Sequence, residues 1–225
     1  MNETIARRQQ AEREERVNKV INVAKKLFYK NGYQRTTVRD IALKAHFSTG
    51  VIYFYFDGKG DIYGRLLEQG YQIYMDMQRE AACAEGTVIE KLKAVAYAYV
   101  NFYLNYPEYH DVISNQAFRH IGLPAEIVKK HDNLSTQSFL IPAALMEEAI
   151  QQGLIIDYKG GGIALILLAW AFIIGLITVH RRGDLDKYGV DFAKSVDFHF
   201  DIFMKGILRQ ESARSSTKSI RQPVR

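Results

Sequence analysis

The chain has 225 residues, of which 48% are hydrophobic, enough for one large domain or a small domain fused to a larger one. Four prolines and few alternating Val/Thr runs favour an all-α fold. The single cysteine, Cys83, excludes an internal disulfide, and the densely charged N-terminus lacks the apolar core of a signal peptide. We therefore expect a cytoplasmic protein.

Charge is distributed unevenly along the chain. Residues 1–60 carry twelve Lys and Arg against six Asp and Glu, residues 61–210 carry fourteen against eighteen, and residues 211–225 carry four against one. A basic head on a slightly acidic body is typical of proteins that bind a polyanion. A solvated charged surface gives the same counts, so charge alone leaves both interpretations open.

Three short helices are predicted in the first 60 residues. The first is expected to begin near Gln10, after a loose arm that carries Arg7 and Arg8, and to end at Asn31-Gly32. A capping box in 37–40 starts a second helix that runs to about residue 45, and Ser48 can cap a third.

Further helices follow in chain order. We expect them over 59–80, from the capping box 87–90 to residue 106, and from Pro107 to Phe118. Residues 124–152 predict one long helix or a broken pair, and two more helices follow at 163–179 and 188–209. The Ser-rich basic tail, 211–225, is expected to be disordered.

The tight turn His46-Phe47-Ser48 between two short helices predicts a helix-turn-helix, in which the second helix enters the DNA major groove. Residues 48–55 are then a recognition helix and not an aromatic strand. Ile52 and Phe56, four residues apart, would face the small core. The residues left for the groove or its rim are Thr49, Val51, Tyr53 and Phe54.

The run TTVRDIALKAHFSTGVIYFYFDGKGDIYGRLL, preceded by VINVAKKLFYKNGYQ, resembles the N-terminal domain of the tetracycline-repressor (TetR) family of bacterial transcription regulators. The matching features are apolar-LF-x3-G, TTVxDIA, S-x-G-x-[IL]-Y-x-Y-F and K-x-x-[IL], in register over about residues 17–67. At the turn, His46 stands where most members have Gly, and Phe47 replaces a smaller aliphatic residue. We expect the turn to survive, since His tolerates positive φ better than most residues.

The resemblance implies phosphate contacts by Thr36, Thr37, Tyr53 and Lys59 and base-facing positions at 49–51. Thr and Val methyl groups can meet thymine methyls, but no Arg, Asn or Gln is placed for a bidentate base contact. Specificity would then depend on DNA shape, on Arg39 or on the N-terminal arm. Each tyrosine has packing within the small core as its alternative role. The predicted DNA-binding residues are Thr36, Thr37, Arg39, Ser48, Thr49, Gly50, Val51, Tyr53, Phe54, Tyr55 and Lys59.

Ile163–Val179 is the strongest apolar run, and it falls slightly short of the about 20 residues of a membrane span. Burial on the domain core and on a partner subunit explains it better than a membrane does. The resemblance implies that the last two helices pair with those of a second copy in a four-helix bundle. The predicted dimer interface comprises Leu168, Phe172, Gly175, Phe192, Val196, His199 and Phe203.

Aromatic residues are concentrated between the head and the predicted dimer face. The resemblance implies an effector pocket there, and an apolar pocket with phenol hydroxyls suits an aromatic or amphipathic small molecule. For each residue the alternative is an ordinary place in the core. The predicted effector-binding residues are Tyr71, Tyr74, Tyr99, Phe102, Tyr103, Tyr106, Phe139 and Trp170.

No pattern indicates catalysis, a metal or a cofactor. His110, His120 and His131 are not at a ligand spacing on one helix, and Gly160-Gly161-Gly162 lacks the Gly-Lys-Ser/Thr ending of a phosphate loop. Ser215–Lys218 has a Ser-x-x-Lys spacing, but a disordered tail cannot preorganise a nucleophile.

These observations predict an all-α protein of about nine helices. A helix-turn-helix DNA-binding domain would occupy residues 1–58, and a larger effector-binding and dimerisation domain residues 59–210. The expected function is that of a homodimeric DNA-binding regulator, a repressor released from a palindromic operator by a small apolar or aromatic ligand. An architectural DNA-binding protein without effector and a transcriptional activator are the alternatives, and no enzymatic activity is expected.

Overall fold

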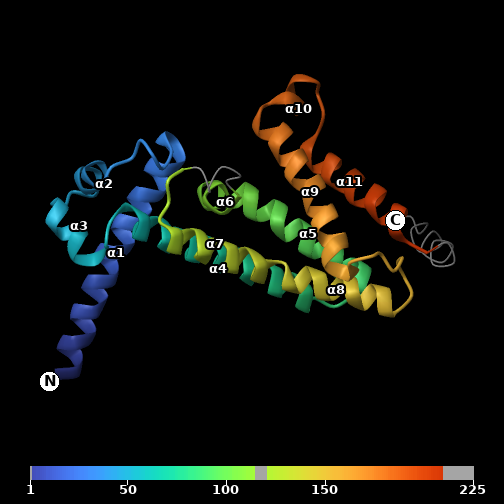
Figure 1. Cartoon of the computed structure of the whole chain (residues 1–225), viewed down its shortest axis with the longest axis horizontal. Coiled ribbons are helices and arrows are strands. Elements are labelled where there is room, and N and C mark those ends of the chain that lie inside the picture. The colour runs from blue at the N-terminus through green and yellow to red at the C-terminus, as the bar shows by residue number, and fades with distance from the viewer. Residues whose placement is uncertain (1, 115–120, 210–225) are drawn as a thin grey trace, which may run out of the picture. The chain divides into compact units, whose positions relative to one another are not determined.

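The structure is a computed structural model that describes residues 2–114 and 121–209. These residues form helices and loops, with one isolated antiparallel bridge between Ile155 and Leu208 and no regular strand (Figure 1), so the predicted all-α class is confirmed. In chain order the described helices are α1 (Asn2–Asn31), α2 (Val38–Ala45), α3 (Thr49–Tyr55), α4 (Lys59–Cys83), α5 (Val88–Asn105), α6 (Pro107–Ser114), α7 (Ala125–Ser138), α8 (Leu140–Gln151), α9 (Gly161–Arg181), α10 (Asp184–Lys187) and α11 (Phe192–Ile207).

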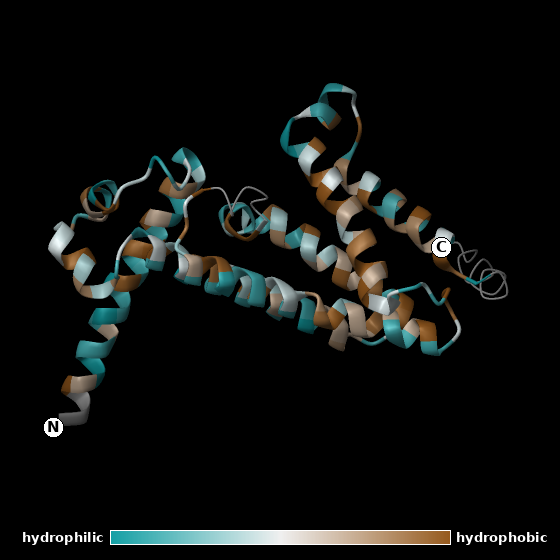
Figure 2. Ribbon diagram, viewed as in Figure 1, coloured by the Kyte–Doolittle hydropathy of each residue, from teal (hydrophilic) through white to brown (hydrophobic). Residues whose placement is uncertain are grey.

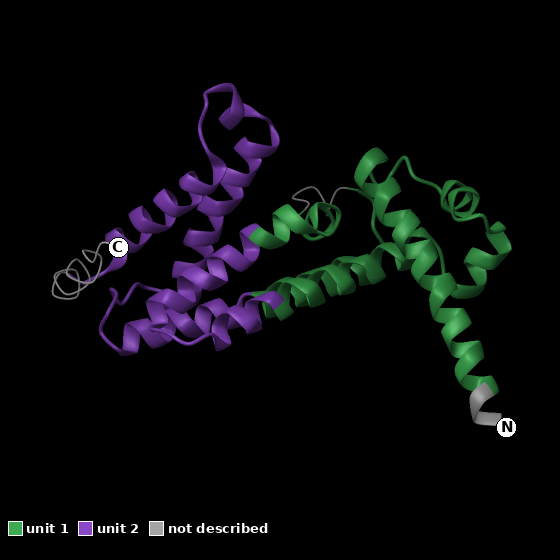
Figure 3. Cartoon of the chain, turned by 180° about the vertical axis from the view of Figure 1, so that it is seen from behind, with its two compact units in different colours: residues 1–76, 101–138 green, residues 77–100, 139–225 purple. Residues whose placement is uncertain are grey.

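The chain forms two compact units (Figure 3). Unit 1 contains Met1–Asp76 and Asn101–Ser138, and unit 2 contains Met77–Val100 and Phe139–Arg225. The divisions fall inside α4 and α5, because each of these long helices contributes to both units. The predicted boundary between a DNA-binding domain (1–58) and an effector-binding and dimerisation domain (59–210) stays a prediction.

Local signals determine α2 and α3. The Thr37 hydroxyl accepts a hydrogen bond from the Asp40 N–H, and the Asp40 carboxylate accepts one from the Thr37 N–H, which is the predicted capping box. The Ser48 hydroxyl caps α3 by accepting from the Val51 N–H. At the C-terminus of α2, His46 adopts φ 59°, the left-handed conformation that ends many helices.

Unit 1 buries the apolar faces of these helices. Ile52 and Phe56 lie inside, as predicted, together with Phe28 from α1 and Ile41 and Ala45 from α2. The caps thus set the ends of the helices, and the buried stripes set how they pack.

Several predicted boundaries were wrong. The first helix begins at Asn2, so Arg7 and Arg8 lie on a helix and not in a loose arm. The exposed first turns are rich in helix-forming Glu, Gln, Arg and Ala, and Arg8 pairs with Glu12 one turn on. Residues 124–152 form the broken pair, α7 and α8, which was one of the two predicted alternatives, whereas α10 was not predicted. The predicted end of the sixth helix at Phe118, and the tail 211–225, lie outside the described residues.

Unit 2 is built on the close crossing of α8 and α9. A Cβ on Gly162 would collide with the Ala143 carbonyl oxygen, so only glycine permits this approach. The Glu147 carboxylate accepts a hydrogen bond of 3.1 Å from the Gly162 N–H, which satisfies one of the free amides at the start of α9. Apolar residues run along almost the whole of α9 (Figure 2).

Candidate nucleic-acid interface

Helix α3 presents a surface that the core does not use. Tyr53 is 60% exposed and Phe54 76% exposed, while Ile52 on the same turn is fully buried. Ser48, Thr49 and Gly50 are exposed at the N-terminal end, and Val51 and Tyr55 are half-buried. The structure therefore brings the predicted α3 residues onto a short stretch of helix that is free to contact another molecule.

Cations near α3 come from other helices, since α3 itself has no basic residue. The Arg13 guanidinium carbon lies 6.0 Å from the centre of the Tyr55 ring, and the Lys19 ammonium lies 5.0 Å from that of Phe47. Sequence reasoning missed Arg13 and Lys19. The basic density of α1 was visible, but the packing of α1 decides which of its cations reach the helix-turn-helix.

Three predicted DNA-binding residues lie at the start of α2, and they differ in accessibility. Thr37 and Arg39 are exposed, and hydrogen bonds from the Thr37 hydroxyl and N–H hold the pKa of Asp40 below its usual value. Thr36 is fully buried, and its hydroxyl donates to the carbonyl oxygens of Gly32 (2.9 Å) and Leu27 (3.4 Å). A phosphate contact by the Thr36 side chain is therefore not supported, because its donor is used inside unit 1.

Lys59 holds α4 against the loop that follows α1. Its ammonium donates to the carbonyl oxygens of Tyr33 at 2.8 Å and Gln34 at 3.4 Å, and it lies 4.2 Å from the centre of the Tyr33 ring. Partial burial lowers the pKa of Lys59. The predicted phosphate contact remains compatible with this geometry, since an ammonium has three donors, but Lys59 also has a structural role.

One further exposed residue was missed. Leu43 on α2 is 76% exposed, although leucine is usually buried. Its neighbour Lys44 is exposed as well. The sequence analysis did not single out Leu43, and the orientation of α2 places it on the surface.

Five predicted effector residues lie in unit 1, on α4, α5 and the turn after it. Tyr71, Tyr74, Phe102 and Tyr103 are buried, and only Tyr106 is exposed. The rings are linked: Tyr74 lies 5.4 Å and Tyr106 5.9 Å from Phe102, centre to centre. The Tyr71 hydroxyl lies 3.3 Å from Nε2 of buried His131, and burial raises the pKa of Tyr71 to about 12.

The other three predicted effector residues lie in unit 2. Tyr99 is buried, and Phe139 packs edge-on against Trp170 at 5.6 Å between ring centres. The predicted set is thus divided between the two units.

Unit 2 exposes an apolar surface on α9 and α11. Phe172 is 51% exposed and packs against His199 and Phe203, at 4.8 and 6.3 Å between ring centres. Gly175 and Leu168 are exposed too, and Phe192 stacks on His180. Val196 is buried within its own chain, so its prediction as an interface residue was wrong. We name the exposed residues the α9/α11 face: Ile163, Leu167, Leu168, Phe172, Phe198 and Ile202.

Among the described residues, α9 is the helix that is long and apolar enough to cross a membrane, and only 22% of its most apolar window is buried inside the single chain. Core helices of soluble proteins meet the same criterion of length and composition, but they are mostly buried. Within the same ranges, no group of three or more His, Cys, Asp or Glu side chains is placed to hold a metal ion.

Comparison with known proteins identifies the head. The family profile described as bacterial regulatory proteins, tetR family, matches residues 20–66. The transcriptional regulator HbdR of Aromatoleum sp. (strain CIB) is 51% identical over 49 residues, which are 22% of this chain and 21% of that protein. The transcriptional regulator TtgR of Pseudomonas putida is 33% identical over 75 residues, 33% of this chain and 36% of that protein. The matched segments thus span between a fifth and just over a third of these relatives.

Solved structures match over most of the length. MbdR from Azoarcus sp. CIB superposes with a TM-score of 0.71 at 22% identity, covering 86% of this chain and all of that one. FadR from Bacillus subtilis, solved in complex with stearoyl-CoA, gives 0.66 at 22% identity, covering 84% of this chain and 98% of that one. At such identity the match establishes the fold alone.

The fold and the exposed α3 place the chain among the helix-turn-helix DNA-binding proteins. Its residues 20–66 match the TetR family of bacterial regulatory proteins, and the two named relatives are transcriptional regulators. A single helix such as α9 is weak evidence for a membrane span.

Proposed function

We propose that the chain is a homodimeric, sequence-specific repressor that leaves a palindromic operator when a small apolar or aromatic ligand binds. Residues 1–58 would contact DNA, and residues 59–210 would bind the ligand and form the dimer. The observation that carries the proposal is α3, whose buried Ile52 and exposed Tyr53 and Phe54 make it a helix anchored on one face and free on the other.

The DNA contact would combine phosphate binding with apolar base contacts. The Tyr53 hydroxyl and the exposed Thr37 and Arg39 suit phosphates, whereas Thr49 and Val51 carry methyl groups that fit thymine methyls. With no bidentate side chain on α3, DNA shape and the cations of neighbouring helices would supply the remaining specificity.

The dimer would form through the α9/α11 face. A surface with this many exposed large apolar residues on two adjacent helices marks an interaction site in a soluble protein. A two-fold axis through it would place two α3 helices about 35 Å apart, or somewhat more, on successive major grooves. This arrangement is what requires a palindromic operator.

The ligand would act by shifting a population of conformations. One form would hold the two heads at operator spacing, and a ligand that prefers another form would release DNA. The aromatic clusters around Phe102 and Trp170 support an apolar or aromatic ligand. The stearoyl-CoA bound to the similarly folded FadR makes long acyl compounds a second class to test.

The first experiment is fluorescence anisotropy with the DNA upstream of the protein's own gene and a scrambled competitor, at two salt concentrations. Tyr53→Ala should weaken binding to the upstream DNA about tenfold, because it removes one phosphate contact without disturbing the core. The matched control is Tyr158→Ala, which removes an exposed tyrosine of unit 2.

Equal affinity for both DNAs, insensitive to any small molecule, would instead favour an architectural DNA-binding protein. Failure to bind DNA selected from a random pool, after removal of co-purified ligand, would overturn the proposal.

A further inference from the structure

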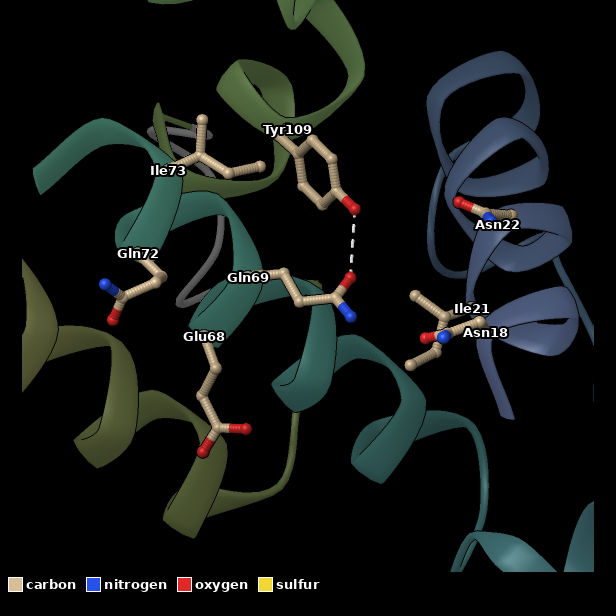
Figure 4. A pocket seen from close by; sticks show the side chains of 8 residues that line it. All are labelled: Asn18, Ile21, Asn22, Glu68, Gln69, Gln72, Ile73 and Tyr109. Carbon is tan, nitrogen blue, oxygen red and sulfur yellow. Dashed lines mark hydrogen bonds between the residues drawn. The ribbon is translucent and has the colours of Figure 1, made fainter. Parts of the chain in front are cut away.

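A cleft in unit 1 lies between α1, α4 and α6 (Figure 4). Its volume is about 480 Å³, within the roughly 300–1,000 Å³ range of small-molecule sites. None of the predicted effector or DNA-binding residues lines it. The lining residues are Asn18, Ile21, Asn22, Glu68, Gln69, Gln72, Ile73 and Tyr109.

Four of the eight lining residues carry carboxamides. Asn18 and Asn22 lie one turn apart on α1, while Gln69 and Gln72 lie on α4, on the other side of the cleft (Figure 4). Each carboxamide offers two donors and an acceptor. Four of them on two facing helices can therefore bind a molecule that has donors and acceptors on several sides.

Much of this hydrogen-bonding capacity is unused. The side chains of Asn18 and Asn22 make no hydrogen bond within the described part of the chain. The Gln69 amide oxygen accepts a bond of 2.9 Å from the Tyr109 hydroxyl, which fixes its orientation, and its amide nitrogen has no protein partner among the described residues. Gln72 is the exception, because its amide nitrogen donates to Asp76 at 2.9 Å.

The lining itself carries little charge. Glu68 is the one charged residue of the lining, and its carboxylate pairs with the Lys130 ammonium at 2.8 Å. The base of the cleft is apolar, since Ile21 is buried and Ile73 is half-buried. A bound molecule would meet amide groups and aliphatic carbon, and the nearby Lys25 ammonium lies against the Tyr109 ring, 4.1 Å from its centre.

We propose that this cleft is a binding site for an uncharged, hydroxyl-rich small molecule of the size of a mono- or disaccharide. Hydroxyl groups both donate and accept, which matches carboxamides better than an anion or a hydrocarbon does. The C–H face of a sugar ring would pack against Ile21 and Ile73.

A molecule in the cleft would connect the head to α4. Helix α1 packs in the core of the head, whereas Glu68, Gln69 and Gln72 belong to α4. Close packing already joins α4 to α6, because a Cβ on Gly70 would meet Ile113 at 3.0 Å. Bridging α1 and α4 would change DNA affinity, a consequence that rests on the proposed function.

The test is saturation-transfer NMR on the full chain with glucose, ribose, sucrose and trehalose as probes. At least one probe should receive saturation from the protein. The Asn18→Ala/Asn22→Ala double variant should weaken that binding about tenfold or more, because it removes two carboxamides. Both residues are exposed, so the fold should be unaffected.

The matched control is Asn133→Ala, which removes an exposed carboxamide of α7 in the same unit and should leave the affinity unchanged. Absence of saturation transfer to all four probes would overturn the site, as would binding that the double variant does not weaken. Anisotropy with operator DNA separates the two proposals. A protein that binds a sugar through Asn18 and Asn22 but binds no DNA would retain the site and refute the proposed function.

Discussion

Helices α3 and α9 differ in how they divide their residues between the core and the surface. Helix α3 has seven residues, and one buried residue, Ile52, anchors it while its aromatic side chains face outwards. Helix α9 has 21 residues, and it buries a few of them while large apolar side chains stay exposed on several turns. The packing of α3 is complete within one chain, whereas we propose that α9 completes its packing with a partner. The two helices thus differ in what they leave exposed: α3 exposes a few aromatic side chains next to a complete core, whereas α9 exposes large apolar side chains on several turns.

The largest expected effect is on the anchor of α3. Replacing Ile52 with Ala should destabilise unit 1 by about 3 kcal/mol, because it leaves a cavity in a small core. Thermal unfolding followed by circular dichroism would measure the loss. Tyr53→Ala is the control, and since that side chain is exposed, it should change stability by less than about 0.5 kcal/mol. An Ile52→Ala variant as stable as the parent would refute the anchoring role.

A charge placed on the α9/α11 face should separate the dimer. Phe198 is 67% exposed in the single chain, and Phe198→Asp should weaken self-association by at least about 2 kcal/mol, or roughly thirtyfold. Sedimentation velocity across a concentration series would show it. Leu104→Asp, at a half-exposed leucine of unit 1, is the control. A monomeric parent protein would contradict the proposed dimer directly.

The capping box of α2 should have a smaller effect. Thr37→Ala should destabilise unit 1 by about 1 kcal/mol, and Thr37→Ser should restore most of it, since serine caps at least as well. Chemical denaturation measures both variants. If Thr37→Ser restores stability but not DNA affinity, the threonine methyl group contributes to the DNA contact. If Thr37→Ala is as stable as the parent, the hydrogen bonds between Thr37 and Asp40 do not stabilise unit 1.

The smallest effect concerns the charge of Asp40. Hydrogen bonds from Thr37 lower its folded-state pKa, so its stabilisation is present above the unfolded pKa of about 4 and is lost as pH falls through the lowered folded value. The parent should be slightly more stable than Asp40→Asn at pH 7 and lose this advantage near pH 3. Denaturation at the two pH values tests it, and a pH-independent difference would contradict the assignment to charge.

Short-range chemistry was the predictable part of the structure. The capping boxes at Thr37 and Thr87, the Ser48 cap and the positive φ of His46 are set within a few residues, and all were predicted correctly. The start of α1 was predicted too late, near Gln10, although the residues of the expected arm are good helix formers.

The rest depends on packing between helices. Thr36 and Val196 were predicted for surfaces and are buried, whereas Arg13, Leu43 and Phe198 were not predicted and are exposed. Along one helix, neighbouring residues point in directions about 100° apart, so a small error in the orientation of the helix exchanges a buried residue for an exposed one. The sequence identifies the helix and its apolar stripe, but tertiary contacts decide the edges of the stripe.

The crossing of α8 and α9 has a consequence for assembly. Because Gly162 allows the Ala143 carbonyl so close and Glu147 binds the Gly162 amide, α9 has a single rotational setting about its own axis. A one-residue slip of α9 would turn its exposed residues by about 100° and separate them from those of α11. Gly162 therefore constrains the symmetry of any assembly through this face. Its buried contacts with Ala143 and Glu147 determine which α9 residues a second copy would meet.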